Sequence, residues 1–579
     1  MSLTAQIHNQ TYNTISVNDD EFLRELEERY GIKHLYLPQN FDQGDELVEL
    51  LNKQLNHARR ISYIYNVVEY VKENGFLSLF GLKWGDEGKG RWVDGFLAEI
   101  IKLINTDIEV VNYRFAGGAN AGHTVTKTIT GPDGNSTVQK FEHHTLPSTI
   151  TEVRVKSVLG TGMVIDPAQM LEELDELENR LGRDEYADLY VAERANVVMP
   201  WHKILDTLNS GSIGSTGRGI GPAYEDRANR LDKISFHDFI YNVDKFETEV
   251  RRITNKRIGR IQGEFNLGVY DTSIVQEDID GIKKQLDANL IIAQYGELRE
   301  RILNEYKGKV EFIDDNSFLN DIHQKGGIIF AEGAQGALLD VDIGTIPNVT
   351  SSKPGPGGAN YGMSILENQC RVGVVKAMDT RVGGGVLLTE ADILFDDIKG
   401  EIDGIESLLQ EKIKDPKESI WTQAEEFVYY NALATGVDPL DALRSSDLRS
   451  RLNNEDIGIQ KVAKLELNEM RLTIVDWLLE KINDQSDERN DDYFGVLMRI
   501  QGNEYGVTTG RPRRNGHQDL TSLDYAVKHT NPHLIALTKL DVLSGIDKLK
   551  VCVGYELDGQ LYANSEEIEA LGLMPSSEE

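Results

Sequence analysis

One segment of the chain joins an apolar run to glycines, a lysine and two carboxylates. Residues 76–82 are mostly apolar, the sequence Gly85-Asp86-Glu87-Gly88-Lys89-Gly90 follows, and residues 91–101 have the apolar spacing of a helix. Strand, glycine loop and helix in this order are typical of a phosphate-binding loop. Glycine lets backbone N–H groups approach phosphate oxygens, and the lysine adds a positive charge. The sequence therefore predicts a site for a nucleoside triphosphate.

The spacing within this loop is unusual. Only two residues separate Gly85 from Gly88, and Gly90 occupies the position where a serine or threonine usually binds Mg²⁺. An ordinary ATPase or small GTPase is therefore a poor fit. Phosphates would repel Asp86 and Glu87 unless a metal or a proton-transfer role retains them. Taken alone, the loop could also be a simple glycine turn between a strand and a helix.

Seven further motifs follow the loop in order. They are Gly117-Gly118-Ala119-Asn120-Ala121-Gly122-His123-Thr124, Gly160-Thr161-Gly162-Met163-Val164-Ile165-Asp166-Pro167, Ser215-Thr216-Gly217-Arg218-Gly219-Ile220-Gly221-Pro222-Ala223-Tyr224-Glu225-Asp226, Glu332-Gly333-Ala334-Gln335-Gly336-Ala337-Leu338-Leu339-Asp340, Thr380-Arg381-Val382-Gly383-Gly384-Gly385, Thr508-Thr509-Gly510-Arg511-Pro512-Arg513-Arg514 and Thr538-Lys539-Leu540-Asp541-Val542-Leu543. In the order of the motifs and in their amino-acid sequences, the whole set closely resembles the adenylosuccinate synthetase family of purine ligases, over about residues 76–545.

The resemblance implies an activity and a set of catalytic residues. The family joins L-aspartate to the 6-position of IMP, forming adenylosuccinate, and GTP hydrolysis drives the reaction through a 6-phosphoryl intermediate. Asp86 matches the general base and Mg²⁺ ligand, and a carboxylate can do both. His123 matches the acid that contacts the transferred phosphoryl group, and Gln335 would donate a hydrogen bond to the 6-oxyanion. Lys89 would hold the triphosphate, and the Gly122 carbonyl would be a second Mg²⁺ ligand.

The resemblance also implies three groups of binding residues. Those matching triphosphate contacts are Gly85, Asp86, Glu87, Gly88, Lys89, Gly90, Arg91, Gly122, His123, Thr124, Arg513, Lys539, Leu540 and Asp541. Those matching purine nucleotide contacts are Asn120, Ala121, Thr216, Arg230, Gln335, Thr350 and Arg511. Those matching aspartate contacts are Val507, Thr508, Thr509, Gly510, Arg511 and Arg513, where guanidinium groups suit a dicarboxylate. Arg230 matches an arginine that reaches the IMP phosphate of the other subunit, which implies a homodimer.

Composition restricts the partners and the compartment. The 61 lysines and arginines against 95 aspartates and glutamates give a net charge of −34, which argues against a nucleic-acid or anionic-membrane partner. Positive charge should then be concentrated in the site, at Lys89, Arg218, Arg230, Arg381, Arg511 and Arg513. The two cysteines exclude a disulfide framework. Without a transmembrane run or an obvious signal peptide, we expect a cytoplasmic protein.

The predicted fold class is α/β, with a large central, mostly parallel sheet flanked by helices, as in a P-loop-like GTPase-type ligase fold, and with added helical segments. Four parts are expected: a helical N-terminal extension (1–75), the first part of the catalytic core (76–390), a helical insert (391–500), and the second part of the core with the aspartate loop and base motif (501–579). Apolar residues 327–330 and 534–537 predict buried strands, and the acidic residues 484–492 predict an exposed return loop.

The motifs leave two identities open: the nucleobase of the triphosphate and the 6-oxopurine nucleotide that is the substrate. Lys539 and Asp541 favour GTP, but the family's closing base-binding segment is absent after Gly545, so ATP is the alternative. Residues 434–439 resemble that segment, although a helix end followed by an aspartate cap explains them better. A second interpretation is an aspartate ligase for dGMP or another 6-oxopurine nucleotide that uses ATP, as in the viral 2-aminoadenine pathway. A third is a catalytically idle nucleotide-binding protein, against which Asp86, Lys89, His123 and Gln335 argue together.

Overall fold

The protein is represented by a computed structural model. It describes residues 6–7, 10–11, 71, 74–104, 107–130, 136–208, 217–270, 274–360, 369–381, 384–385, 387–391, 423–437, 442, 446, 448–452, 457–484, 490–505, 512–557 and 560–562. The chain divides into two compact units, residues 1–73 and 74–579. In the first unit the described residues form an antiparallel pair, β1 (Gln6–Ile7) and β2 (Gln10–Thr11). The helical patterns predicted within residues 19–26 and 47–55 lie outside the described residues.

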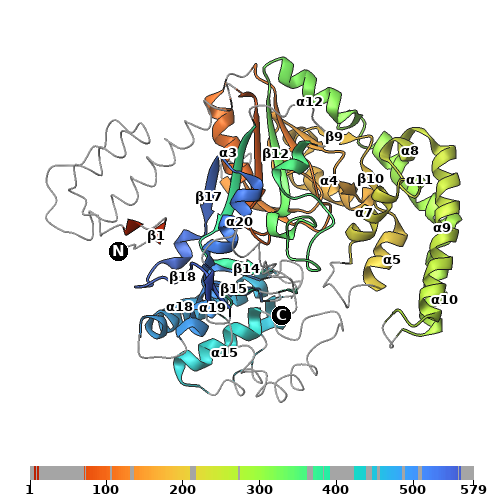
Figure 1. Ribbon diagram of the computed structural model, residues 1–579. Helices are drawn as coiled ribbons and strands as arrows, with labels where there is room; N and C mark the ends of the chain where they lie inside the picture. The colour runs from red at the N-terminus through yellow and green to blue at the C-terminus, as the bar shows by residue number, and fades with distance from the viewer. Residues whose placement is uncertain are drawn as a thin grey trace. The chain divides into compact units, whose positions relative to one another are not determined.

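An eight-stranded sheet forms the centre of the second unit, and every pairing in it is parallel. In spatial order its strands are β11 (Val310–Ile313), β9 (Leu189–Ala192), β7 (Val155–Leu159), β4 (Val110–Arg114), β12 (Ile328–Gly336), β3 (Phe76–Gly81), β13 (Cys370–Lys376) and β17 (Leu534–Thr538). Helices pack around the sheet, which confirms the predicted α/β class (Figure 1).

Short strand pairs surround the central sheet. The hairpin β5 (His123–Thr130) and β6 (Ser136–His143) is antiparallel, as are β14 (Asp379–Arg381) with β15 (Arg514–Gly516) and β19 (Tyr555–Leu557) with β20 (Gln560–Tyr562). Two parallel pairs are β8 (Val164–Ile165) with β10 (Asn196–Val197) and β16 (Gln518–Asp519) with β18 (Val551–Cys552). The β14–β15 pair matters for the site because it connects the segment after β13 to the segment that follows the predicted aspartate loop.

The helices of the core fall between these strands. They are α3 (Lys89–Leu103), α4 (Pro167–Leu181), η1 (Arg183–Glu185), α5 (Pro200–Leu208), α7 (Ile220–Asn229), α8 (Phe236–Tyr241), α9 (Val243–Asn266), α10 (Gln276–Gln285), α11 (Ala288–Asn304), α12 (Asp315–Gln324), η2 (Ala337–Leu339), α13 (Pro356–Ala359), α20 (Leu520–Thr530) and η4 (Leu540–Leu543). A cluster of buried apolar side chains joins α4, α5, α8, α9 and α11 to β9. None of the helices in the described part of the chain is long and apolar enough to cross a membrane.

The two strands predicted from apolar runs, β12 and β17, differ in how far their side chains are buried. Ile328, Ile329 and Phe330 in β12 are buried because β12 lies between β4 and β3. β17 is the last strand of the sheet, and one of its faces is open: Ile535 is 48% exposed and Leu537 is 47% exposed. The prediction of a buried strand is therefore confirmed for β12 and wrong for β17.

Four described helices lie within or begin in residues 391–500, the segment predicted as a helical insert. They are α15 (Gln423–Thr435), α17 (Leu448–Leu452), α18 (Ile457–Asn483) and α19 (Asn490–Gly502), and Figure 1 shows α15, α18 and α19 side by side. Their buried residues, such as Phe427 and Leu478, share a cluster with Met378 and Leu543 of the core. The predicted loop 484–492 is too long by three residues, because α19 already begins at Asn490.

The strand register places several strand ends at one edge of the sheet. Gly81 at the end of β3 pairs with Val374 of β13, and Lys376 at the end of β13 pairs with Thr538 of β17. Parallel strands present their carboxyl ends at the same edge, where ligands of open α/β sheets bind. The glycine loop follows β3, so this edge is where the site should lie.

Candidate active site

The glycine loop turns sharply between β3 and α3. Gly85 has a φ of 87°, Gly88 of 84° and Asp86 of 59°, all in the left-handed region. Glycine adopts this region without strain, whereas Asp86 is held there by its surroundings. Helix α3 begins at Lys89, and Gly88 provides no side chain to cap it. The first N–H groups of α3 are thus available to an anion.

Glu87 and Lys89 are turned into the protein. The Glu87 side chain is 2% exposed, and its Oε1 accepts hydrogen bonds from the backbone N–H groups of Lys83 (3.2 Å) and Gly85 (2.9 Å). Lys89 Nζ lies 2.6 Å from Glu87 Oε2. The Glu87 carboxylate therefore stabilises the loop from within, a role that neither a metal nor a proton-transfer explanation anticipated. Lys89 must leave Glu87, or be shared with it, to contact a phosphate.

Asp86 is the exposed carboxylate of the loop. Its side chain is 38% exposed and forms an ion pair with Nη1 of Arg513, while Lys376 Nζ lies 3.7 Å from Asp86 Oδ2. Arg513 and Lys376 are in turn bound by the buried carboxylate of Glu504, at 2.8 Å each. The structure therefore brings together the predicted general base and a predicted aspartate-binding arginine.

His123 lies beside the start of α3 and is held by a buried carboxylate. A Cβ added at Gly90 would lie 3.1 Å from His123 Nδ1, a tight contact that a larger residue could make only if the histidine moved slightly. His123 Nδ1 is 2.9 Å from Oε1 of Glu332 and 2.8 Å from Oγ of Ser148. Glu332 also accepts hydrogen bonds from Asn112 Nδ2 at 2.8 Å and from the Ser148 N–H at 3.0 Å.

Electrostatics fix the protonation pattern of this pair. Burial alone would raise the pKa of Glu332, but His123, Arg114 and Ser148 hold it at about 2. Burial lowers the pKa of His123, an effect that Glu332 opposes. Because Glu332 is ionised, Nδ1 of His123 carries a proton and faces Glu332, so Nε2 is the nitrogen left for a ligand and donates to a phosphoryl oxygen once it too is protonated.

Gln335 is hydrogen-bonded to Asn120 and linked through Ser352 to Thr350, and both of these residues are predicted to contact the purine nucleotide. Gln335 Nε2 donates to Asn120 Oδ1 at 3.2 Å, and Ser352 Oγ donates to Gln335 Oε1 at 2.9 Å. Thr350 Oγ1 lies 3.1 Å from Ser352 Oγ. A shift in the β12–β3 register between Glu332 and Gly336 interrupts the strand, and it gives Gln335 a φ of 58°. This irregularity sets Gln335 beside Gly85, whose Cβ would lie 3.5 Å from the Gln335 Cα.

Backbone strain coincides with the predicted site. The described non-glycine residues with positive φ are Asp86, Arg230, Gln335, Asn503, Asn531 and Lys539. Four of these six were predicted from the motifs, and Asn503 adjoins Glu504. Non-glycine residues persist in this region only where neighbouring structure enforces it, which happens most often at functional sites.

The predicted nucleobase-binding motif, residues 538–543, begins at the end of β17 and is bonded to the glycine loop. Thr538 Oγ1 donates to the backbone carbonyl of Glu87 at 2.8 Å. Lys539 Nζ donates to the carbonyl of Gly502 and lies 3.5 Å from Glu504 Oε1. Leu540 is 59% exposed, and Asp541 is also exposed. The exposed carboxylate of Asp541 could accept hydrogen bonds from the edge of a nucleobase, and the exposed side chain of Leu540 could pack against its face.

Several predicted residues are not assembled by the described structure. Thr216 and residues 507–511, which include Val507, Thr508, Thr509, Gly510 and Arg511, lie outside the described residues, as does the side chain of Arg91. Ala121, Gly122 and Thr124 flank His123, and Gly122 and Thr124 are exposed. Arg381 does not serve as exposed positive charge, because it is 1% exposed and its Nη2 donates to Thr345 Oγ1 at 2.9 Å.

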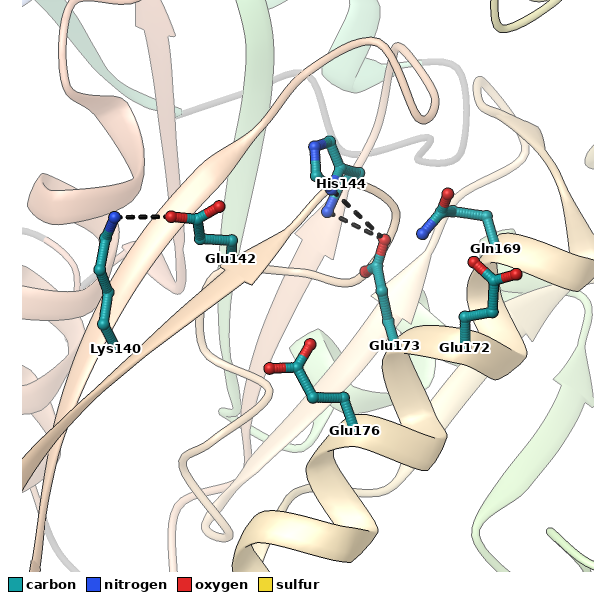
Figure 2. Close-up of a pocket in the computed structure, with 7 residues that line it drawn as sticks. All are labelled: Lys140, Glu142, His144, Gln169, Glu172, Glu173 and Glu176. Carbon is teal, nitrogen blue, oxygen red and sulfur yellow. Dashed lines mark hydrogen bonds and ion pairs between the residues drawn. The ribbon is translucent and has the colours of Figure 1, made fainter. Parts of the chain in front are cut away.

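A hollow of about 400 Å³ lies between β6 and α4 (Figure 2). Four glutamates line it, of which Glu173 accepts backbone hydrogen bonds from His144 and Thr145, each 3.0 Å long. A Cβ at Gly122 would lie 3.7 Å from the His144 ring, so this hollow is close to the site. Its carboxylates would repel anionic nucleotides. We therefore assign the hollow no part in nucleotide binding.

Three neighbours of the site were given no role by the motif analysis: Glu332, Lys376 and Glu504. Glu332 opens the motif that contains Gln335, and its position within an otherwise apolar strand, β12, is the one signal that could have marked it. Lys376 is the last residue of β13 and Glu504 follows the end of α19 by two residues, each just before a motif used for other residues. Their partners are remote in sequence, so their pairing is visible only in the fold.

Together these groups offer a defined set of chemical roles. An exposed carboxylate, a histidine oriented through its Nδ1, and an amide bonded to polar neighbours surround one glycine loop. Such a set can accept a proton, stabilise a transferred phosphoryl group and hydrogen-bond an oxyanion.

Comparison with known proteins agrees with this chemistry. The adenylosuccinate synthetase family model matches residues 78–574. The adenylosuccinate synthetases of Salinibacter ruber (30% identical; 83% of this chain and 81% of that protein) and Chlorobium chlorochromatii (32%; 83% and 80%) are similar. The structure of fully ligated adenylosuccinate synthetase from Plasmodium falciparum aligns with a TM-score of 0.52 and 27% identity, covering 85% of this chain and 83% of that one. The chain belongs to the adenylosuccinate synthetase family, whose members are ligases that form a C–N bond.

Proposed function

We propose that this chain joins the amine of L-aspartate to C6 of IMP and uses GTP as the phosphoryl donor. The observation that carries the proposal is the grouping of Asp86, His123 and Gln335 around the glycine loop at the carboxyl edge of the sheet. In the proposed sequence, Asp86 accepts the N1 proton and the 6-oxygen attacks the γ-phosphate. GDP leaves, His123 contacts the transferred phosphoryl group, and the aspartate amine then attacks C6, so that inorganic phosphate departs with the 6-oxygen.

We further propose that the reaction uses Mg²⁺ bound by Asp86 and the Gly122 carbonyl. Both positions are exposed, and a carboxylate with a carbonyl matches the oxygen donors that Mg²⁺ prefers. Among the described residues no group of three or more His, Cys, Asp or Glu side chains could hold a metal alone. Two protein ligands suffice when phosphates and water complete the coordination. The bound cation would neutralise charge on the β- and γ-phosphates.

The function is tested by a matrix of substrates. IMP, GMP and dGMP are each combined with GTP or ATP in the presence of L-aspartate and Mg²⁺, and phosphate release and nucleotide products are measured. We expect adenylosuccinate from IMP with GTP and less product from every other combination. Lys539 and Asp541, present beside the loop, support GTP as the donor. Preferred turnover of dGMP with ATP would replace this proposal by the 2-aminoadenine type of ligase, and turnover of none would favour an idle binding protein.

The proposed assembly is a homodimer in which Arg230 completes the partner's IMP site. Arg230 is exposed, has a φ of 68° at the end of α7, and lines a hollow of about 480 Å³ with Arg194 and Lys233. Within the described ranges no hydrogen bond or ion pair joins Arg230 to another side chain. Burial, together with the charges of Arg227 and Arg194, lowers the pKa of Lys233 to about 8. Glu193, Asp238 and Asp314 line the same hollow, and Asp314 and Asp238 pair with Arg194 and Lys245, which leaves Arg230 as the exposed cation proposed to reach an anion of a second subunit.

Mixing two impaired variants tests this arrangement. At an IMP concentration below KM, Arg230→Leu and Asp86→Asn chains should each be nearly inactive, the first through loss of a charge-assisted phosphate contact. A heterodimer regains one site with its own Asp86 and the partner's Arg230, so the mixture should be active. Subunit exchange is verified by mass spectrometry of differently tagged chains. A fully exchanged mixture that is no more active than its parents would show that Arg230 does not act across subunits.

A further inference from the structure

Glu504 is a buried carboxylate that three cations share. Its side chain is 1% exposed. Oε1 lies 2.8 Å from Lys376 Nζ and 3.5 Å from Lys539 Nζ, and Oε2 lies 2.8 Å from Arg513 Nη1. Burial alone would raise the pKa of Glu504, but Lys376, Arg513 and Lys539 hold it at about 2, so the carboxylate is ionised at neutral pH.

The three cations come from separate parts of the fold. Lys376 ends β13, Lys539 follows β17 and Arg513 precedes β15. The register of β13 with β17 aligns Lys376 with Thr538, the residue before Lys539. Glu504, just after α19, is therefore the one acidic group that contacts all three among the described residues. Two of the three, Lys539 and Arg513, belong to the predicted triphosphate and aspartate contacts.

Glu504 also helps to join the two segments that flank the predicted aspartate loop, residues 504–505 and 512–513. The Arg513 N–H donates to the Glu504 carbonyl at 2.9 Å, and a β-bridge joins Tyr505 to Pro512. The ion pair between the Glu504 and Arg513 side chains adds a third connection between these two segments. Residues 506–511 between these ends carry the predicted aspartate contacts. The two segments that flank residues 506–511 are therefore held together by backbone and side-chain contacts.

The charge of Glu504 is needed at this position. Lys376, Arg513 and Lys539 supply three positive charges, which only Glu504 and Asp86 offset within the cluster. Without the Glu504 charge, Lys376 would remain buried, at 3% exposed, beside two other cations with no full neutralisation. The cations would then separate or compete for Asp86.

We propose that Glu504 is a positioning residue that sets the guanidinium of Arg513 and the ammonium of Lys539 relative to Asp86. The proposal rests on the proposed function, since it assigns Glu504 a part in binding aspartate and the triphosphate. Asn120, Gln335 and Thr350 are held by hydrogen bonds among themselves and with Ser352, none of which involves Glu504. The IMP contacts made by Asn120, Gln335 and Thr350 should therefore depend on Glu504 least.

Glu504→Gln tests the proposal because glutamine keeps the shape of the side chain and removes its charge. Loss of charge-assisted bonds to Arg513 and Lys539 should raise KM for aspartate by about tenfold or more and KM for GTP by about threefold or more, with KM for IMP changed by less than about threefold. Initial rates are measured with each substrate varied in turn, and the melting temperature of each protein is recorded.

Glu390→Gln is the matched control. It removes the carboxylate that binds Arg514, the residue next to Arg513, through Nε at 2.7 Å. The three KM values of this control should stay within about twofold of wild type. Equal KM values for wild type and Glu504→Gln, or a common rise in all three, would overturn the positioning role. A wild-type enzyme that forms no adenylosuccinate would instead refute the proposed function itself, and the Glu504 proposal would fall with it.

Discussion

Replacement of Asp86 by asparagine is expected to lower kcat by about 10²–10⁴-fold, because the substitution removes a positioned proton acceptor. Asparagine fits the site sterically: it has the size of aspartate and tolerates the left-handed φ of 59° at this position better than alanine does. The same change removes the proposed Mg²⁺ ligand, so the Mg²⁺ concentration needed for half-maximal activity should also rise. Steady-state rates at several Mg²⁺ concentrations measure both effects.

Folding is not expected to explain the loss in Asp86→Asn. Asp86 is partly exposed, and Arg513 retains Glu504 as a partner at 2.8 Å, so the melting temperature should change little. Asp280→Asn, which removes an exposed carboxylate paired with Lys283 on α10, should keep wild-type rates. Retention of more than about a tenth of wild-type kcat by Asp86→Asn corresponds to less than about 1.4 kcal/mol of barrier and would exclude Asp86 as the base.

Replacement of His123 by asparagine should give a stable protein with kcat lowered by about 10²–10⁴-fold. The asparagine amide can occupy the place of Nδ1 and keep a donor on Glu332, which accepts at 2.9 Å in the wild type. What asparagine lacks is Nε2, the atom left for the transferred phosphoryl group. His123→Asn thus separates the bond that holds the side chain from the atom proposed to act in catalysis. Single-turnover phosphoryl transfer and thermal unfolding are measured together.

The comparison with His123→Ala makes this assignment specific. Alanine removes both nitrogens and leaves Glu332 buried without one of its partners, so we expect inactivity together with a loss of about 1–3 kcal/mol of stability. His123→Asn should lose the activity but little of the stability. If His123→Asn were nearly as active as wild type, the histidine would serve only to neutralise Glu332, and another group would have to stabilise the phosphoryl transfer.

The sequence was a good guide wherever one local pattern defines the structure. Gly85, Gly88 and the apolar runs on either side predicted the β3–loop–α3 unit, because glycine spacing and hydrophobic periodicity are short-range properties. The same reasoning failed for β17. Its apolar sequence resembles that of a central strand, but burial depends on its place at the end of the strand order, which the local sequence does not encode.

Glu87 shows a second limit of local reasoning. Its position inside a phosphate loop suggested contact with the ligand, yet the fold turns its carboxylate inward against the N–H groups of Lys83 and Gly85. The direction of a loop side chain depends on backbone dihedrals that the surrounding strands impose. Gly81 and Gly336 leave the space that Glu87 fills, since a Cβ at either position would come within 2.5 Å of its carboxylate.

The sequence by itself determined the family, the α/β class and the residue types available for chemistry, because these follow from ordered motifs and from local periodicity. Only the tertiary structure decided which charges neutralise one another: Glu332 with His123, and Glu504 with Lys376, Arg513 and Lys539. These groups meet because parallel strands distant in sequence end at one edge of the sheet. Burial there makes each uncompensated charge costly, so the strand order fixes the pairs.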